Sequence, residues 1–336
     1  MKKTIRTILQ TRRIRNIVLY SLACAMPFCA ARAAEKWDMP MAYSASNYHS
    51  EIGVEFAAEA TRDSGGALEI VAHPGGSLFG GAEIYGAVRR GAAPIGERLI
   101  SALGNEDPLF GLDSVPFLAT SFADARRLYA ASRPDLEKKL DESGLVLLYS
   151  VPWPPQGFYS VRPARSKDDL RGLKFRAYNA ITSRLAELMG MSPTKIEAAE
   201  LQQAFATGAA ESMVSSGSTG YDRKLWEHVN YYYDVRAWLP RNMVFANKEA
   251  WENLDDSARA AVREAATRAE EKGWAKAEEL AGWYVEQFRA KGMEVGDAPA
   301  QLQNDFAEAG AQLRAEWLEE SGEQGRAILA RYRAAE

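Results

Sequence analysis

The stretch K-D-D-L-R-G-L-K-F-R, residues 167–176, is the most informative part of this 336-residue chain. Its first residues belong to a polar loop expected over 165–172, and its last residues begin a short strand expected over 173–177. A helix is expected next, over 181–189. The stretch therefore predicts a strand that ends close to Arg176 and leads into a helix, which is the repeating unit of an α/β fold.

The chain before this stretch alternates expected strands with expected amphipathic helices. The strands are placed at 37–43, 68–72 and 145–151, and the helices through 52–60, at 82–90, near 123–131 and at 135–143. Glycines end two of these helices, as is common at helix C-termini. This alternation predicts an α/β fold with a mostly parallel core. The run V-P-W-P-P, residues 151–155, interrupts the pattern and is interpreted as a crossover between two domains.

The chain after this crossover repeats the alternation and then becomes helical. Further strands are expected at 157–161, 194–196, 212–215 and 243–246, with a long β-rich run over 229–239. Residues 255–291 predict a helix long enough to bend or to run across both domains, and a last helix covers roughly 298–332. We expect domain I over 34–157 with about 243–282, and domain II over 158–242 with about 283–336.

The first 33 residues are interpreted as a cleavable signal peptide. They contain basic residues between Lys2 and Arg15, a short apolar run over 17–30, and the small-x-small sequence A-R-A, which predicts cleavage near Ala33. The apolar run is shorter than the roughly 20 residues that a membrane-spanning helix needs, which disfavours the alternative of an N-terminal membrane anchor. We therefore expect the mature protein in the periplasm.

Removal of this segment changes the cysteine count and the charge. Cys24 and Cys29 both lie in it, so we expect no disulfide and no thiolate chemistry in the mature chain. The segment holds seven of the 41 basic residues and no acidic residue, which leaves 34 basic against 45 acidic residues and a net charge of −11. Such an acidic chain is not expected to bind nucleic acid or an anionic membrane. An anionic ligand would need a local basic group.

Catalytic and metal-binding motifs are not found in the sequence. The three histidines, His49, His73 and His228, are far apart and have no metal-ligand spacing. The serine-rich run 215–220 lacks the G-x-S-x-G pattern of a hydrolase, and the glycine-rich run 75–81 is not a nucleotide-binding motif. We therefore expect no enzyme, no cofactor and no metal. A secreted α/β protein of two domains is more typical of a clamshell binder that closes over a ligand.

The stretch 167–176 also resembles a hallmark of the solute-binding proteins of TRAP (tripartite ATP-independent periplasmic) transporters, the DctP-like family, which reads approximately D-L-K-G-L-K-hydrophobic-R. The resemblance implies a two-domain periplasmic-binding-protein clamshell with hinge-crossing strands and a long C-terminal helix that spans both domains. It also implies that Arg176 points into the interdomain cleft and binds the ligand carboxylate. The chemistry agrees, because a guanidinium group offers a rigid fork of donors that matches a carboxylate.

Other segments resemble motifs of this family in the same order, along nearly the whole mature chain. They are residues 83–91, which end in A-V-R-R-G, residues 113–118, which end in V-P-F-L, residues 200–208 and residues 221–227. The resemblance implies a receptor that captures a small carboxylate and delivers it to TRAP membrane permease subunits. The alternatives are a periplasmic ligand sensor, a binding protein of an ATP-driven transporter, and a periplasmic lyase or hydrolase.

Two departures from the family pattern bear on the ligand. Tyr159 stands where many relatives have a second arginine, and in the run that contains Ser215 and Ser216 a serine replaces the amide that many relatives have. Both changes remove partners for a second charged group, so we expect a monocarboxylate rather than a C4-dicarboxylate, which stays the alternative. Aromatic residues near the expected cleft favour an aromatic or a 2-oxo or 2-hydroxy acid, unless they are ordinary core residues. They are Trp153, Phe158, Tyr159, Tyr178 and Tyr221.

Three further residues complete the expected ligand site. Glu97 follows the turn at Gly91 and is a candidate acceptor for a ligand hydroxyl group or ring nitrogen. Asn47 and Tyr48 lie in the loop after the first expected strand and are candidates on the same grounds.

Overall fold

The described chain starts with the β-α-β unit that the sequence predicts. The computed structural model describes residues 34–335, so the expected signal peptide, its cleavage site near Ala33, and both cysteines lie outside the described residues. β1 (Glu35–Pro40) and β2 (Leu68–His73) pair in parallel and are connected through α1 (Tyr48–Asp63). Asn47 caps α1, because its side-chain oxygen accepts a hydrogen bond of 2.9 Å from the backbone N–H of His49.

A second sheet in this half of the molecule is antiparallel. β10 (Arg241–Asn247) lies between β3 (Ile95–Leu99) and β4 (Leu145–Pro152) and runs antiparallel to both. The expectation of a mostly parallel core is therefore wrong for this sheet, because the chain re-enters it from the opposite direction through β10. The helices α2 (Ile84–Arg89), α3 (Phe122–Glu142) and α9 (Asp256–Ala290) contact its strands. These two sheets and their helices form what we call the first lobe.

One helix, α3 (Phe122–Glu142), replaces the two helices expected near 123–131 and 135–143. Pro134 lies inside it and removes one backbone donor. The helix continues because Leu128, Leu136 and Leu140 lie on the same face and are all buried. Two 3-10 helices, η1 (Ile100–Leu103) and η2 (Pro108–Ser114), complete the first lobe.

The second lobe is built on a mixed six-stranded sheet with the strand order β11-β9-β5-β8-β6-β7. Its strands are β5 (Gln156–Ser160), β6 (Lys174–Ala177), β7 (Ser192–Lys195), β8 (Ser212–Ser216), β9 (Tyr231–Tyr233) and β11 (Glu294–Gly296). Only β9 forms a strand within the β-rich run expected over 229–239. The short helices are α4 (Lys167–Leu170), α5 (Ala180–Leu188), η3 (Ala198–Glu200), α6 (Leu201–Ala206), α7 (Gly217–Asp222) and η4 (Leu225–Glu227).

The stretch 167–176 adopts the arrangement that positions Arg176. Its first residues form the one-turn helix α4 rather than an open loop, with Ser166 and Asp169 as a capping box. Gly172 follows with a φ of 74°, a conformation that glycine adopts without steric cost. β6 then runs parallel to both β7 and β8 in the interior of the sheet, so that Arg176 is buried.

Two segments connect the lobes at the place of the expected hinge-crossing strands, and they are hydrogen-bonded to each other. One runs from β4 into β5, and the other, residues 234–240, runs from β9 to β10. We call the pair the crossing ribbon. Its backbone N–H groups donate from Trp153 to Pro240 (2.7 Å), from Gln156 to Trp238 (2.9 Å) and from Ala237 to Gln156 (3.0 Å).

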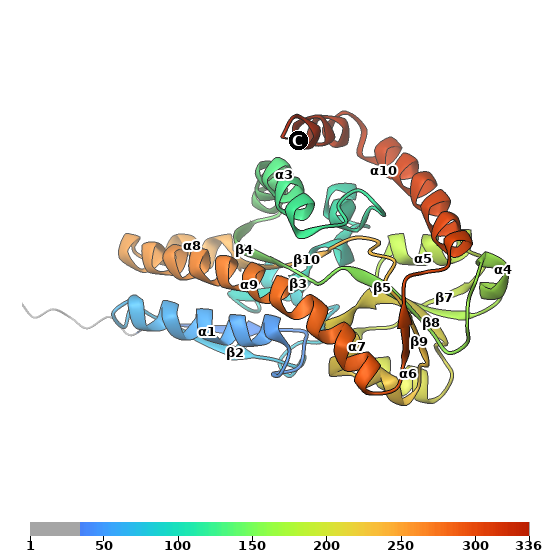
Figure 1. Ribbon diagram of the computed structural model, residues 1–336. Coiled ribbons are helices and arrows are strands. Elements are labelled where there is room, and N and C mark those ends of the chain that lie inside the picture. The colour runs from blue at the N-terminus through green and yellow to red at the C-terminus, as the bar shows by residue number, and fades with distance from the viewer. Residues whose placement is uncertain (1–33, 336) are drawn as a thin grey trace, which may run out of the picture. The chain divides into compact units, whose positions relative to one another are not determined.

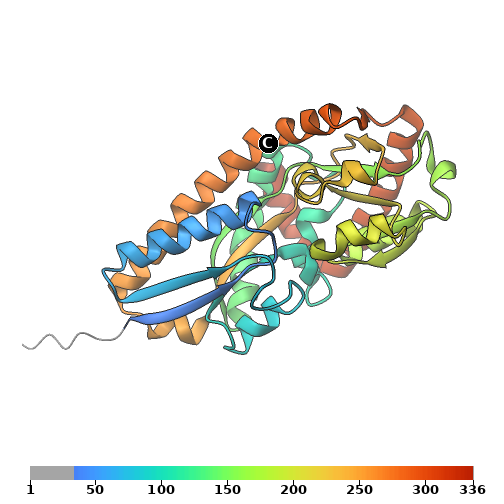
Figure 2. The ribbon, with the colours of Figure 1, turned by 90° about the horizontal axis from the view of Figure 1, so that it is seen from below.

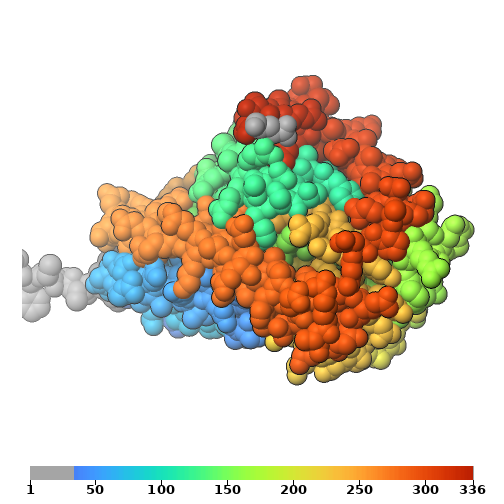
Figure 3. All heavy atoms as spheres, in the orientation of Figure 1, coloured from blue at the N-terminus to red at the C-terminus, as the bar shows by residue number. Residues whose placement is uncertain are grey.

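The long helix expected over 255–291 is confirmed as α9 (Asp256–Ala290), which follows the short helix α8 (Lys248–Asn253). α9 contacts α1 and β4 of the first lobe and α7 and β11 of the second, and Figures 1 and 2 show it running along both. α10 (Ala300–Ala334) is interrupted at Gly322 and contacts α3, η2 and α5. Its last part, in red, covers α3, in green, in Figure 3. Among residues 34–335, no helix combines the length and the apolar character needed to cross a bilayer.

Candidate functional site

A cavity lies where the two lobes meet the crossing ribbon. We call it the interlobe cavity. Three charged side chains line it, Arg98, Arg176 and Glu197. The other lining residues are Tyr43, Leu99, Ala102, Trp153, Gln156, Tyr178, Ala198, Ser215, Ser216, Thr219 and Pro240. The structure thus brings together five of the residues selected from the sequence, namely Arg176, Trp153, Tyr178, Ser215 and Ser216.

Arg176 is held by the protein through one of its three nitrogens. Its Nε donates a hydrogen bond of 2.9 Å to the carbonyl oxygen of Ile196, and its guanidinium carbon lies 5.0 Å from the ring centre of Tyr178. Burial lowers the pKa of Arg176 to about 10, so it remains protonated at neutral pH. Within the described residues its hydrogen bond runs through Nε, which leaves both Nη groups for an acceptor in the cavity.

Arg98 and Glu197 form an ion pair across the cavity, one from each lobe. Arg98 lies in β3 and is 5% exposed, whereas Glu197 follows β7. Nη1 and Nη2 of Arg98 each lie 3.3 Å from one carboxylate oxygen of Glu197, in a two-pronged arrangement. Burial acts to raise the pKa of Glu197, but the charge and hydrogen bonds of Arg98, together with the charges of Lys195 and Arg176, outweigh burial, so the pKa is lowered. Glu197 is therefore ionised at neutral pH.

Several neutral polar groups of the cavity are held in place by hydrogen bonds within the protein. The Tyr178 hydroxyl donates to Oε1 of Gln156 at 3.2 Å and accepts from Nε1 of Trp238 at 2.9 Å. The Nε2 of Gln156 donates to the carbonyl oxygen of Pro154 at 3.0 Å. At the end of β8, the Ser216 hydroxyl accepts from the backbone N–H of Thr219 at 3.1 Å. These contacts hold neutral donors and acceptors in place around the two arginines.

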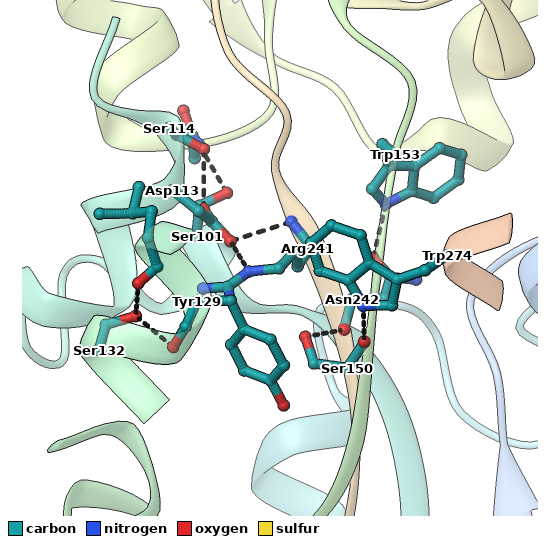
Figure 4. A network of polar contacts seen from close by, with 12 residues as sticks. Ser101, Asp113, Ser114, Tyr129, Ser132, Ser150, Trp153, Arg241, Asn242 and Trp274 are labelled. Carbon is teal, nitrogen blue, oxygen red and sulfur yellow. Dashed lines mark hydrogen bonds and ion pairs between the residues drawn. The ribbon is translucent and has the colours of Figure 1, made fainter. Parts of the chain in front are cut away.

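Trp153 forms the apolar wall on the crossing ribbon. Its ring packs edge-on against Tyr43, with 4.7 Å between ring centres, and lies 4.1 Å from His49. Its Nε1 donates to Oδ1 of Asn242 at 2.8 Å. Figure 4 shows Asn242 between Trp153 and Ser150, whose hydroxyl donates to the Asn242 carbonyl oxygen at 2.8 Å. The orientation of the indole ring is therefore fixed by β10.

Glu97 does not line the cavity, contrary to the expectation, and lies behind Trp153. Its Oε1 accepts a hydrogen bond of 3.0 Å from Nδ2 of Asn242 and lies 3.6 Å from Nδ1 of His49. Burial raises the pKa of Glu97 to about 7 and holds the pKa of His49 well below its usual value. Glu97 and Arg98 are neighbours in one strand, and successive side chains in a strand point to opposite faces. Arg98 therefore faces the cavity and Glu97 the core.

Tyr159 and Phe158 lie in the core of the second lobe rather than in the cavity, again contrary to the expectation. The Tyr159 hydroxyl donates to the carbonyl oxygen of Ser216 at 2.8 Å, and its ring packs edge-on against Tyr232 at 4.8 Å. Phe158 packs against Phe306 with ring centres 5.4 Å apart. Both side chains are fully buried, because β5 is an interior strand of the sheet and is covered on both faces.

Asn47, Tyr48 and Tyr221 also lie outside the cavity lining. Asn47 of the first lobe donates to the Ser218 hydroxyl at 3.1 Å and to the Asp222 carboxylate at 2.6 Å in the second lobe. The Tyr48 hydroxyl donates to the carbonyl oxygen of Pro152. Tyr221 packs against Trp226 and Trp283 at a separate surface hollow. These residues therefore connect parts of the protein to one another, and Asn47 does so between the lobes.

Two charged residues of the site, Arg98 and Glu197, were missed in the sequence. Arg98 belongs to a strand that was not expected there, since the charged pair Glu97-Arg98 is unusual in a buried strand. Glu197 directly follows the expected strand over 194–196 and has no motif of its own. No local signal identifies either residue, because their partnership depends on two segments 99 positions apart in the chain.

Comparison with known proteins gives the site a context. The sequence model described as "Bacterial extracellular solute-binding protein, family 7" matches residues 41–321. A curated solute-binding protein of Albidiferax ferrireducens is 26% identical over 176 residues, which is 51% of this chain, and the chain spans 51% of that relative's length. A second, of Chromohalobacter salexigens, is 24% identical over 214 residues, 63% of this chain and 64% of the relative.

Solved structures with higher identity share the whole fold. A TRAP solute-binding protein from a marine metagenome, specific for pyroglutamate, is 50% identical with a TM-score of 0.89, and the match covers 90% of this chain and 100% of that chain. An extracytoplasmic solute receptor of Bordetella pertussis that binds pyroglutamic acid is 43% identical with a TM-score of 0.87, covering 89% and 99%. These likenesses confirm the two-domain clamshell fold that the sequence predicts.

Proposed function

Because the chain belongs to family 7 of the bacterial extracellular solute-binding proteins, we propose that it is the extracytoplasmic receptor of a TRAP transporter. It captures a small monocarboxylate in the interlobe cavity, where Arg176 pairs with the carboxylate, and delivers this ligand to the membrane permease. The ligand leaves chemically unchanged, so chromatography of the ligand after prolonged incubation with the protein recovers it intact.

The charge of the cavity carries this proposal. Arg98 and Arg176 supply two positive charges, and Glu197 supplies one negative charge that is paired with Arg98. One positive charge, that of Arg176, remains for the ligand. Burying a charged group is costly unless it is paired and hydrogen-bonded, so an anion with a single negative charge is the ligand that the cavity neutralises.

Pyroglutamate is the ligand that we propose first. It combines one carboxylate with a small lactam ring, whose N–H and C=O need neutral polar partners. The cavity offers Gln156, Ser215, Ser216 and Thr219 for these groups and the ring of Trp153 as an apolar wall. Support comes from the solved relatives at 50% and 43% identity, which are described with pyroglutamate. This ligand keeps the expected monocarboxylate and replaces the expected aromatic or 2-oxo or 2-hydroxy acid.

Titration calorimetry with the mature chain tests the proposal. We expect binding of pyroglutamate to the wild type and loss of binding in Arg176→Ala, with an unfolding midpoint of the ligand-free protein close to that of the wild type. The matched control is Arg171→Ala, since Arg171 lies five residues earlier and its side chain is 81% exposed. The panel also contains benzoate, lactate, pyruvate and succinate. Wild-type protein that binds none of these acids contradicts the proposed function, and unchanged affinity in Arg176→Ala contradicts the role of Arg176.

The lobes are proposed to act as the two closing domains. Domain I is placed at 34–157 with about 243–282 and domain II at 158–242 with about 283–336. Support comes from the Arg98–Glu197 and Asn47–Asp222 contacts, each of which joins the lobes beside or near the cavity. Small-angle scattering checks this proposal, because ligand binding is expected to reduce the radius of gyration. A radius that does not change with ligand contradicts domain closure.

The periplasm is the proposed location, since the family is extracellular and the N-terminal sequence reads as a signal peptide. N-terminal sequencing of the protein recovered from a periplasmic extract is expected to start near Ala34. A protein that retains Met1 in the cytoplasmic fraction contradicts this location.

A further inference from the structure

The Arg98–Glu197 pair is placed to decide how much negative charge a ligand can carry. Both Nη atoms of Arg98 are bound to Glu197, each 3.3 Å from one of its carboxylate oxygens, and Arg98 is 5% exposed. The pair is packed against Gly81, where a Cβ atom would lie 2.9 Å from Nη1 of Arg98 and 3.4 Å from Oε2 of Glu197. The absence of a side chain at Gly81 therefore leaves the space that the ion pair occupies.

Two consecutive residues in the turn after β7 bind the two arginines. Ile196 accepts the hydrogen bond from Nε of Arg176, and Glu197, the next residue, neutralises Arg98. The Nη groups of Arg176 therefore remain available to a ligand, whereas the Nη groups of Arg98 are bound to Glu197. Two other cations lie close enough to influence these groups, Lys195 near Glu197 and Arg223 near Arg176, but neither lines the cavity.

We propose that Glu197 is a specificity-determining residue that makes the receptor selective for monoanions, because it occupies Arg98 and presents a negative charge to any second carboxylate of a ligand. This inference rests on the proposed function. The second carboxylate of a dianion would have to displace Glu197 from Arg98 or lie unpaired beside it. Both arrangements are costly in a buried site, and a repulsive group of this kind is a common source of discrimination between ligands.

The first test needs no substitution. Glutarate and its monoamide have nearly the same size and differ by one negative charge. We expect calorimetry with wild-type protein to give an affinity for the monoamide at least about tenfold higher than for glutarate, since placing like charges side by side costs several kcal/mol. Equal affinities for glutarate and its monoamide would overturn the proposal. This test uses the wild type alone, so it does not depend on whether any variant folds.

The second test changes Glu197 itself. Glu197→Gln is expected to raise the glutarate-to-pyroglutamate affinity ratio by about tenfold or more, whereas Glu197→Asp keeps the charge and the wild-type preference. The double variant Arg98→Met with Glu197→Gln restores a single positive charge and is expected to return the preference for pyroglutamate. Glu69→Gln is the control for the loss of one negative charge, because Glu69 is exposed in β2 of the first lobe.

The outcomes separate the two proposals. If the wild type does not bind pyroglutamate or any other monocarboxylate, the proposed function fails. If the wild type binds pyroglutamate and folded Glu197→Gln shows the wild-type affinity ratio, the function stands and the role of Glu197 is overturned.

Discussion

The Nε of Arg176 donates a 2.9 Å hydrogen bond to the carbonyl oxygen of Ile196, which ties a strand in the interior of the second-lobe sheet to the turn after its edge strand β7. The guanidinium group is thus anchored at one nitrogen and free at two. A lysine has a single nitrogen and cannot fill both roles at once.

Arg176→Lys is therefore expected to weaken ligand binding although it preserves the positive charge. Hydrogen bonds to charged groups contribute about 1.5–3 kcal/mol each, so the loss of one corresponds to a roughly 10- to 100-fold lower affinity. Titration calorimetry at constant ionic strength measures the change. A lysine variant with wild-type affinity would show that the charge alone, and not the fork, binds the carboxylate.

Glu97→Gln is expected to change how stability depends on pH. Burial raises the pKa of Glu97 to about 7 from an ordinary value near 4.5, so the folded protein binds this proton more tightly than the unfolded chain does. The contribution of Glu97 is fully favourable below about pH 4.5 and is lost as the pH rises through 7. Between pH 4.5 and pH 8, the free energy of unfolding of the wild type is expected to fall by up to about 3 kcal/mol relative to that of the glutamine variant.

Urea unfolding of both proteins at several pH values measures this difference. The buried pair Asp113–Arg241, shown in Figure 4, also contains a carboxyl group whose pKa burial raises to about 6. It is present in both proteins, so its contribution cancels. Glu69→Gln, at an exposed position of β2, is the control. Parallel curves for the wild type and Glu97→Gln would show that Glu97 is ionised in the folded protein throughout.

Tyr159→Phe separates a ligand contact from a structural role. The hydroxyl group donates to the carbonyl oxygen of Ser216 and the ring is fully buried, so its loss is expected to lower the free energy of unfolding by about 1 kcal/mol. Ligand affinity is expected to change by less than about threefold, since a single neutral hydrogen bond distant from the ligand is affected. A tenfold loss of affinity with unchanged stability would restore the direct contact that the sequence suggested.

Gly157→Ala is expected to destabilise the second lobe. The Cβ atom would fall on the ring of Tyr232, which is buried against Tyr159 and Phe288 and has no space to move. Overpacking of this kind costs about 1–3 kcal/mol or more. Gly282→Ala is the control, because Gly282 lies in α9 with open space around the added methyl group. That change is expected to be neutral or to stabilise by up to about 1 kcal/mol, and thermal unfolding compares the two.

The sequence identified Arg176 but not its two charged neighbours in the cavity, for a physical reason. Arg176 lies in a short strand after a turn glycine, and the motif that identifies it spans ten residues, whereas the Ile196 carbonyl group that holds it lies 20 positions further along the chain. Arg98 and Glu197 meet only when the two lobes come together, and no local pattern encodes that meeting. Glu97 was selected in place of Arg98, its neighbour in β3. In a strand, a displacement of one residue exchanges the cavity face for the core face.

The sequence predicts the positions of strands and helices better than it predicts strand direction and helix continuity. α9 and the strands β2, β4 and β8 lie within one or two residues of the expected bounds, because apolar spacing and capping residues are local. The antiparallel placement of β10 and the continuity of α3 through Pro134 depend on packing against distant segments. The expectation that Phe158 and Tyr159 lie in the cavity was wrong for another reason. Aromatic residues occur both in the core and in cavity walls, so their presence in the sequence does not distinguish the two.

The crossing ribbon has a mechanical consequence for ligand capture. Because its two segments are hydrogen-bonded through Trp153, Gln156 and Ala237, we expect them to bend together and to favour rotation about one axis over sliding of the lobes. Trp153, Gln156 and Pro240 of the crossing ribbon also line the interlobe cavity. In the proposed receptor, a ligand would therefore contact the hinge as well as the two lobes. A ligand of a different width is expected to leave the lobes at a different angle.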